Sequence, residues 1–275
     1  MIISDKHKFI FLHVPKTGGS SVNAFLNQYL GDNDLQLGWP DTLLKGLPYN
    51  KRVYKEINNK KGHKLLIEGF KRRSKDQKIL EKPIIEYALK QIISKKLGSD
   101  SMHARAENVK KFISKKKWNK YFKFCFIRNP YTHAISSWLW DDEKFNLNIK
   151  NSYQYKKFLT KKKFNSHLKK IYKKSLMNDK NVFSRSFLFP GTKIYTINNE
   201  VAVDFIGKFE NLEKDLKKVC KIIGLPKPKF TLTNVKHKVS SRNIEMRKFF
   251  DKENKDLVRK IWKKEFEIFK YKFPY

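Results

Sequence analysis

The chain has little cysteine: Cys125 and Cys220 are the two thiols among its 275 residues. Each lies in an apolar segment, so we expect two buried thiols rather than a disulfide framework. The sequence also lacks an apolar run of about 18 residues, which argues against a transmembrane helix. Its N-terminal stretch is too short and too polar for a signal peptide, so the chain is expected to be cytoplasmic.

Negative charge is scarce as well. The 26 Asp and Glu residues stand against 62 Lys and Arg, which gives a formal net charge of +36. Such an excess indicates anionic partners, such as nucleotides, sulfated or uronic glycans, nucleic acid or acidic lipid. Lysine runs on solvated faces would produce the same total. The net charge alone therefore does not show whether the positive residues serve to bind a partner or only reflect the amino-acid composition. The 40% hydrophobic content argues for a real core.

Strand patterns alternate with helix patterns along the chain. Residues 9–14 and 121–127 are short, continuous apolar runs, as in strands buried on both faces. Helices with an apolar stripe are predicted after each run and over 211–225. This alternation is typical of an α/β fold with a central, mostly parallel sheet flanked by helices. The length suits one domain over 1–275.

Three other segments have less decisive patterns. We expect a variable insertion of helices and loops over 40–117, with a short strand at 64–70 and a helix opened by Pro83. Two strand runs flank the pair Asn198–Asn199, as in a hairpin. A single amphipathic helix is predicted over 251–271.

The first apolar run leads into the turn Pro-Lys-Thr-Gly-Gly-Ser-Ser at residues 15–21. In parallel α/β sheets, ligands lie beyond the carboxyl ends of strands and beside helix N-termini. Two adjacent glycines let the main chain approach a ligand closely, and the first-turn N–H groups favour an anion. The turn also contains an ammonium group and hydroxyl donors, so it predicts an anion site. An ordinary turn with Ser20 as the helix N-cap is the alternative.

A second group of polar residues follows the other apolar run. Arg128 stands directly after it, and Ser136 lies eight residues further on, in a helix that Asn129 and Pro130 are suited to begin. A guanidinium offers a bidentate fork for phosphate, and an Arg beside so apolar a strand is costly without an anionic partner. These residues predict a second anion site. The alternative is an Arg–carboxylate pair beside a surface Ser.

Several nucleotide- and nucleic-acid-binding patterns are absent. The order of residues 15–21 differs from a Walker A loop, in which the glycines precede the Lys, and no Mg²⁺-binding Asp follows a strand. A nucleotide kinase of related topology is therefore disfavoured, although it stays an alternative. Zinc-finger spacing, RNP-type motifs and basic heptads are also missing, which disfavours a non-catalytic nucleic-acid-binding protein. No metal site is predicted.

These motifs resemble those of a known family, the sulfotransferases that use 3′-phosphoadenosine 5′-phosphosulfate (PAPS), in particular its carbohydrate sulfotransferase branch. The resembling segments, in order, are HVPKTGGSS, FIRNPYTHAISSW, DFIGKFENLEKDL and DLVRKIWKKEFEIFKY. The resemblance implies a P-loop-like three-layer fold with helical insertions, and transfer of a sulfonyl group from PAPS without a metal. The implied acceptor is a glycan or another hydroxyl-bearing small molecule, anionic ones included.

The resemblance also implies roles for individual residues. Lys16 would contact the phosphosulfate and support the leaving group. Arg128 and Ser136 would bind the 3′-phosphate, together with Lys238 and Arg242 from a late block that matches only loosely. The residues that would cradle the 5′-phosphate are Thr17, Gly18, Gly19, Ser20 and Ser21.

Histidines complete the predicted site. His103 lies in a segment that resembles one in which a His precedes a helix, and it is the predicted general base. His13 is expected to pack within the first strand, and Glu210 to anchor the structure. Two residues depart from the family's pattern: His133 stands where an Arg is common, and Arg185 lies near the position of a frequent Gln.

Overall fold

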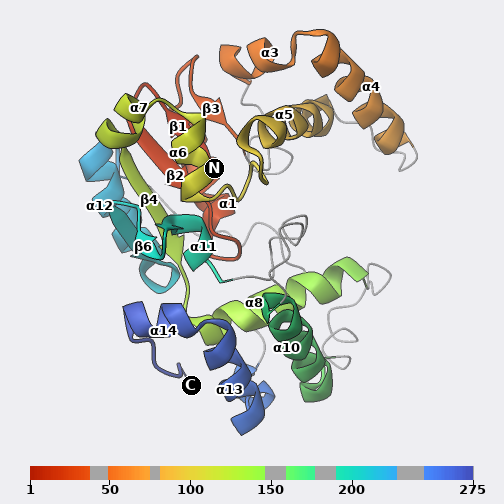
Figure 1. Ribbon diagram of the computed structural model, residues 1–275, viewed down its shortest axis with the longest axis vertical. Helices are drawn as coiled ribbons and strands as arrows, with labels where there is room; N and C mark the ends of the chain where they lie inside the picture. The colour runs from red at the N-terminus through yellow and green to blue at the C-terminus, as the bar shows by residue number, and fades with distance from the viewer. Residues whose placement is uncertain (38–48, 75–80, 146–158, 177–189, 228–244, 275) are drawn as a thin grey trace.

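A computed structural model of the chain describes residues 1–37, 49–74, 81–145, 159–176, 190–227 and 245–274. At its centre is a five-stranded sheet with the strand order β3-β1-β2-β4-β7 (Figure 1). Strands β2, β4 and β7 pair in parallel, whereas β1 pairs antiparallel with both β2 and β3. Four strands therefore run in one direction, as predicted. Their bounds are β1 Ile2–Ser4, β2 Phe9–Leu12, β3 Leu35–Gln36, β4 Phe122–Ile127 and β7 Phe205–Lys208.

Two helical layers cover the sheet. On one face, α1 (Gly19–Asn27) and α12 (Leu212–Ile223) pack on the phenylalanines of β2 and β4. The second helical layer, on the other face of the sheet, contains α5, α6, α7 and α11. These helices pack against Ile10, Leu12 and Cys125. The structure thus has the expected three layers. The bounds on this side are α3 Lys51–Ile57, α4 Lys60–Ser74, α5 Glu81–Leu97, α6 Ala106–Phe112, α7 Lys115–Lys120 and α11 Thr192–Tyr195.

A separate apolar cluster joins the remaining helices at the other end of the molecule (Figure 1). These helices are α8 Pro130–Phe145, α10 Lys161–Leu176, α13 Lys252–Ile261 and α14 Lys263–Phe269, and the short 3₁₀ turn Met246–Phe249 precedes α13. Another 3₁₀ turn, Phe209–Asn211, lies between β7 and α12. The predicted single helix over 251–271 is wrong. It breaks at Trp262, whose ring is 1% exposed within this cluster.

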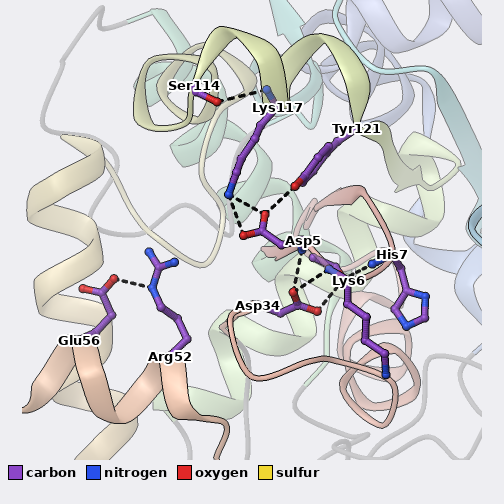
Figure 2. A network of polar contacts seen from close by, with 10 residues as sticks. Asp5, Lys6, His7, Asp34, Arg52, Glu56, Ser114, Lys117 and Tyr121 are labelled. Carbon is purple, nitrogen blue, oxygen red and sulfur yellow. Dashed lines mark hydrogen bonds and ion pairs between the residues drawn. The ribbon is translucent and has the colours of Figure 1, made fainter.

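Strand β1 was missed by the sequence analysis because it has three residues and no turn signature. Tertiary contacts hold it in place. The buried carboxylate of Asp34 accepts hydrogen bonds from Ser4 Oγ at 2.6 Å, Asp5 N at 2.7 Å and Gly31 N at 2.9 Å. Figure 2 shows Asp34 beside the turn that joins β1 to β2. One carboxylate therefore ties this turn to the loop before β3.

The predicted strand at 64–70 is also wrong, since these residues lie in α4. Gly69 allows α4 to approach α5, because a Cβ there would lie 3.0 Å from Tyr87 Cδ1. Packing of α4 against α5 thus outweighs the tendency of this short apolar run to form a strand. The hairpin prediction is confirmed: β5 (Thr196–Ile197) and β6 (Glu200–Val201) flank Asn198 and Asn199, both with positive φ.

Two expectations from composition can be compared with the structure. Both cysteines are free thiols and buried, as predicted. Within the described residues, none of the helices combines the length and apolar character that crossing a membrane would require.

Candidate active site

The loop between β2 and α1 has a shape set by its own residues. Lys16 and Gly18 both adopt left-handed backbone conformations, with φ of 62° and 80°. Thr17 is 1% exposed, and its Oγ1 donates to the Val14 carbonyl at 2.8 Å. The hydroxyl hydrogen of Thr17 is therefore used inside the loop. Any donation from Thr17 to a ligand would have to come from its amide.

Glycine is required at both positions where the loop meets α1. A Cβ on Gly18 would lie 2.8 Å from Leu212 Cδ2, and one on Gly19 would lie 2.0 Å from His13 Cδ2. Gly18 is the N-cap of α1, so the alternative with Ser20 as N-cap is wrong. No side chain among the described residues caps this helix. Its first N–H groups therefore remain suited to an external anion.

Arg128 follows β4 and reaches the same loop. Its Nη1 donates to the Lys16 carbonyl at 3.3 Å, and its Nε donates to Thr132 Oγ1 at 3.0 Å. The guanidinium lies over the ring of Phe209, 4.2 Å from the ring centroid. Since β2 and β4 are parallel neighbours, their carboxyl ends meet at one edge of the sheet. The two predicted anion sites therefore converge.

The start of α8 is held by polar contacts. The helix begins at Pro130, and Tyr131 N donates to Asn129 Oδ1 at 3.1 Å, as expected for a capping Asn. Asn129 N in turn donates to Glu210 Oε1 at 2.7 Å. Glu210 thus anchors the structure, as predicted. These contacts hold the chain immediately after Arg128.

One face of α8 lines the converging sites. Thr132, Ser136 and Trp140 are four residues apart, so they lie on the same side of the helix. Thr132 contacts Arg128, and the ring of Trp140 lies 4.6 Å from Lys16 Nζ. The half-buried Ser136 therefore stands between the two basic residues. The sequence analysis missed Trp140, although its spacing from Ser136 is a signal that could have found it.

His133 occupies the neighbouring position on α8. Its side chain is 3% exposed, and its ring lies 5.5 Å from that of Trp262. Burial lowers the pKa of His133 to about 3, and the charges of Arg128 and Lys16 lower it as well. The imidazole is therefore neutral near pH 7. Its Nε2 has no hydrogen-bond partner in the described part of the chain.

His103 is placed behind the loop by His13. The His103 Nδ1 lies 2.8 Å from the His13 carbonyl oxygen, and the two rings are 4.6 Å apart. Because a carbonyl only accepts, Nδ1 carries the proton and Nε2 carries the lone pair. Burial lowers the pKa of His103 to about 4, against the raising effect of Asp100. His13 packs as expected and contacts both His103 and the start of α1.

Three residues that the sequence analysis named lie outside the described residues: Arg185, Lys238 and Arg242. No group of three or more His, Cys, Asp or Glu side chains suited to a metal ion occurs in the described ranges.

Comparison with known proteins identifies the family. A model described as "Sulfotransferase family" matches residues 1–272. The chain belongs to the sulfotransferase family. This sulfotransferase is accordingly a PAPS-dependent transferase. It is also 34% identical over 117 residues to an uncharacterized protein of Archaeoglobus fulgidus, an alignment that covers 42% of this chain and 77% of that protein. No solved structure matches it significantly.

Proposed function

We propose that this sulfotransferase moves the sulfonyl group of PAPS to a hydroxyl of a carbohydrate acceptor. The observation that carries the proposal is the contact between Arg128 Nη1 and the Lys16 carbonyl. PAPS has an anionic group on each side of its ribose, and the chain offers a basic residue for each. Lys16 and the start of α1 would hold the 5′-phosphosulfate. Arg128 and Ser136 would hold the 3′-phosphate.

The donors in this site fit phosphate and sulfate groups. Two hydrogen bonds and the Phe209 ring fix the plane of the Arg128 guanidinium before a ligand arrives. Lys16 Nζ is similarly held over Trp140. Such pre-organisation reduces the entropy lost on binding. The neutral imidazole of His133 lies next to these cations, and its buried Nε2 has no hydrogen-bond partner among the described residues.

The chemistry requires charge stabilisation at the leaving group. As the sulfonyl group departs, the 5′-phosphate oxygen gains negative charge. Lys16 and the first N–H groups of α1 would stabilise that charge through pre-arranged donors. The side chains of Thr132 and Ser136, on one face of α8, would lie beneath the nucleotide. Positioning and electrostatics thus supply most of the proposed catalysis.

His103 is the proposed general base. The low pKa keeps its imidazole neutral, and the bond to the His13 carbonyl presents Nε2 as the accepting atom. His103 would take the proton from the acceptor hydroxyl during attack on sulfur. His13 connects it to the start of α1, where the sulfonyl group would lie.

Two features support a carbohydrate acceptor. The later blocks of the sequence resemble the carbohydrate branch of the family, and the net charge of +36 suits an acidic glycan.

The test is sulfate transfer from radiolabelled PAPS to neutral oligosaccharides, uronic oligosaccharides and a simple phenol. We expect labelled carbohydrate, and no product with Lys16→Ala protein whose circular dichroism matches that of the wild type. Transfer to the phenol alone would contradict the carbohydrate assignment. Failure of 3′-phosphoadenosine 5′-phosphate (PAP) to bind in calorimetry at low salt would contradict the donor site.

A further inference from the structure

A pocket lies among α3, α4 and α5, and it has a volume of about 770 Å³. We call it the basic pocket. Five of its lining side chains are cationic, and one carboxylate is found among its lining residues in the described chain. The lining residues are Asn33, Arg52, Lys55, Glu56, Asn59, Lys61, Ile92, Lys95 and Lys96.

The basic pocket is separate from the donor site. Asn33 stands just before β3, and β3 pairs with β1 so that Leu35 lies opposite Ile3. The register of β1 with β2 places Ser4 opposite Phe9, at the start of β2. Asn33 therefore lies at the edge of the sheet where β2 begins. The donor loop leaves from the other end of β2, beyond Leu12.

The carboxylate in the pocket is already engaged. Glu56 Oε1 accepts from Arg52 Nε at 2.8 Å, and Oε2 accepts from Lys96 Nζ at 2.6 Å. Burial raises the pKa of Glu56, but hydrogen bonds from Lys96 and Arg52 hold it below its ordinary value. Figure 2 shows the terminal nitrogens of Arg52 pointing away from Glu56. Glu56 thus orients the guanidinium fork and leaves its outer edge for another acceptor.

The remaining cations of the pocket have no such partner among the residues that the structure describes. Lys55, Lys61 and Lys95 are exposed, and the described residues form no ion pair with them. Asn59 caps the adjoining helix through its Oδ1, which accepts from Gly62 N at 3.0 Å, so the positive end of α4 meets the pocket. Like charges gathered in a hollow repel one another and attract anions.

We propose that the basic pocket binds a compact polyanion that carries two or more phosphate or sulfate groups. Its volume lies within the range of about 300–1,000 Å³ for small-ligand sites. Arg52 supplies a planar fork for one such group, and the lysines supply point charges for a second. One engaged carboxylate does not neutralise five cations. The proposal does not depend on the chemistry at the donor site.

Calorimetry with two probes tests the proposal. Pyrophosphate represents phosphate ligands and a disulfated disaccharide represents sulfate ligands, each titrated at about 0.15 M salt with saturating PAP present. We expect one site for at least one probe. Lys55→Gln combined with Lys95→Gln should weaken it by at least about tenfold. Arg52→Lys, which keeps the charge but loses the fork, should weaken it too.

A charge-matched control separates a site from general attraction. Lys214 and Lys221 are exposed on α12, away from the pocket (Figure 1). Replacing both with Gln should change the affinity by less than about twofold, since distant exposed charges are screened. An equal loss in this control would overturn the proposal. It would also be overturned if neither probe bound, or if a probe bound only when PAP was left out. If PAP did not bind, the proposed donor site would be refuted, but the comparison between the pocket variants and the Lys214/Lys221 control would still test the basic pocket.

Discussion

The guanidinium of Arg128 donates from Nη1 to the main-chain carbonyl of Lys16 over 3.3 Å. This bond joins two loops that are 112 residues apart in the sequence. It sets the predicted 5′-phosphosulfate residue beside the predicted 3′-phosphate residue. A nucleotide that spans both would therefore contact two strand ends at once, and each residue can be tested through one end of the ligand.

Arg128→Ala should weaken PAP binding by about 1.5–3 kcal/mol, the range for hydrogen bonds to charged groups. Adenosine 5′-monophosphate lacks the 3′-phosphate, so its affinity should change little. Calorimetry with both ligands gives the difference, and Arg128→Lys serves as the charge-preserving control. Equal losses for the two nucleotides would show that Arg128 does not recognise the 3′-phosphate.

Trp140→Leu should lower the transfer rate by about two- to thirtyfold, because a cation–π contact contributes about 0.5–2 kcal/mol. The Trp140 ring lies under Lys16 Nζ and holds the ammonium in place. Trp140→Phe keeps an aromatic face and should retain most of the rate. The measurement is single-turnover transfer at saturating PAPS. A similar defect in both variants would point to helix packing rather than to Lys16.

Gly18→Ala should destabilise the protein by about 1–3 kcal/mol from backbone strain, and further through the clash with Leu212. Gly98→Ala is the matched control, since Gly98 also has positive φ but nothing lies within 4 Å of its Cβ position. Urea denaturation of both variants isolates the packing cost at Gly18. Equal destabilisation would mean that the close approach of Leu212 to the loop has no energetic consequence.

His103→Asn should lower kcat by about 10²–10⁴-fold, the usual contribution of a general base. Because burial lowers the pKa of His103 to about 4, kcat/KM of the wild type should be independent of pH from 5 to 9. PAP affinity, measured in parallel, should be nearly unchanged by the substitution. An inflection near pH 7 that disappears in the variant would contradict the buried, neutral state of His103.

His133→Gln should reduce the loss of stability in acid. The pKa of His133 is about 3 in the folded chain and 6.5 for an unperturbed histidine, so the unfolded chain binds the extra proton between these values. Stability is therefore full above pH 6.5 and falls as the pH drops, by about 1.4 kcal/mol per unit. Urea titrations from pH 7 to 5 should show a shallower slope in the variant. An unchanged slope would place the acid sensitivity elsewhere.

Strong local patterns predicted much of the fold. The apolar runs of β2 and β4, the stripe of α12 and the Asn198–Asn199 turn are each specified by neighbours in the sequence. Elements that depend on distant partners were missed: β1 depends on Asp34, and α4 depends on close packing against α5. Short segments have too few residues for periodicity to outweigh such contacts.

The sequence by itself was enough to predict the two loops as anion sites, because glycine, lysine and arginine at strand ends have a local chemical meaning. Their meeting was decided by the pairing of β2 with β4, which brings together residues that the chain keeps far apart. The tertiary structure alone placed Trp140 under Lys16 and His103 behind His13. Contacts of this kind form when helices pack on a sheet. The spacing of residues in the sequence does not show which side chains from distant segments will come into contact.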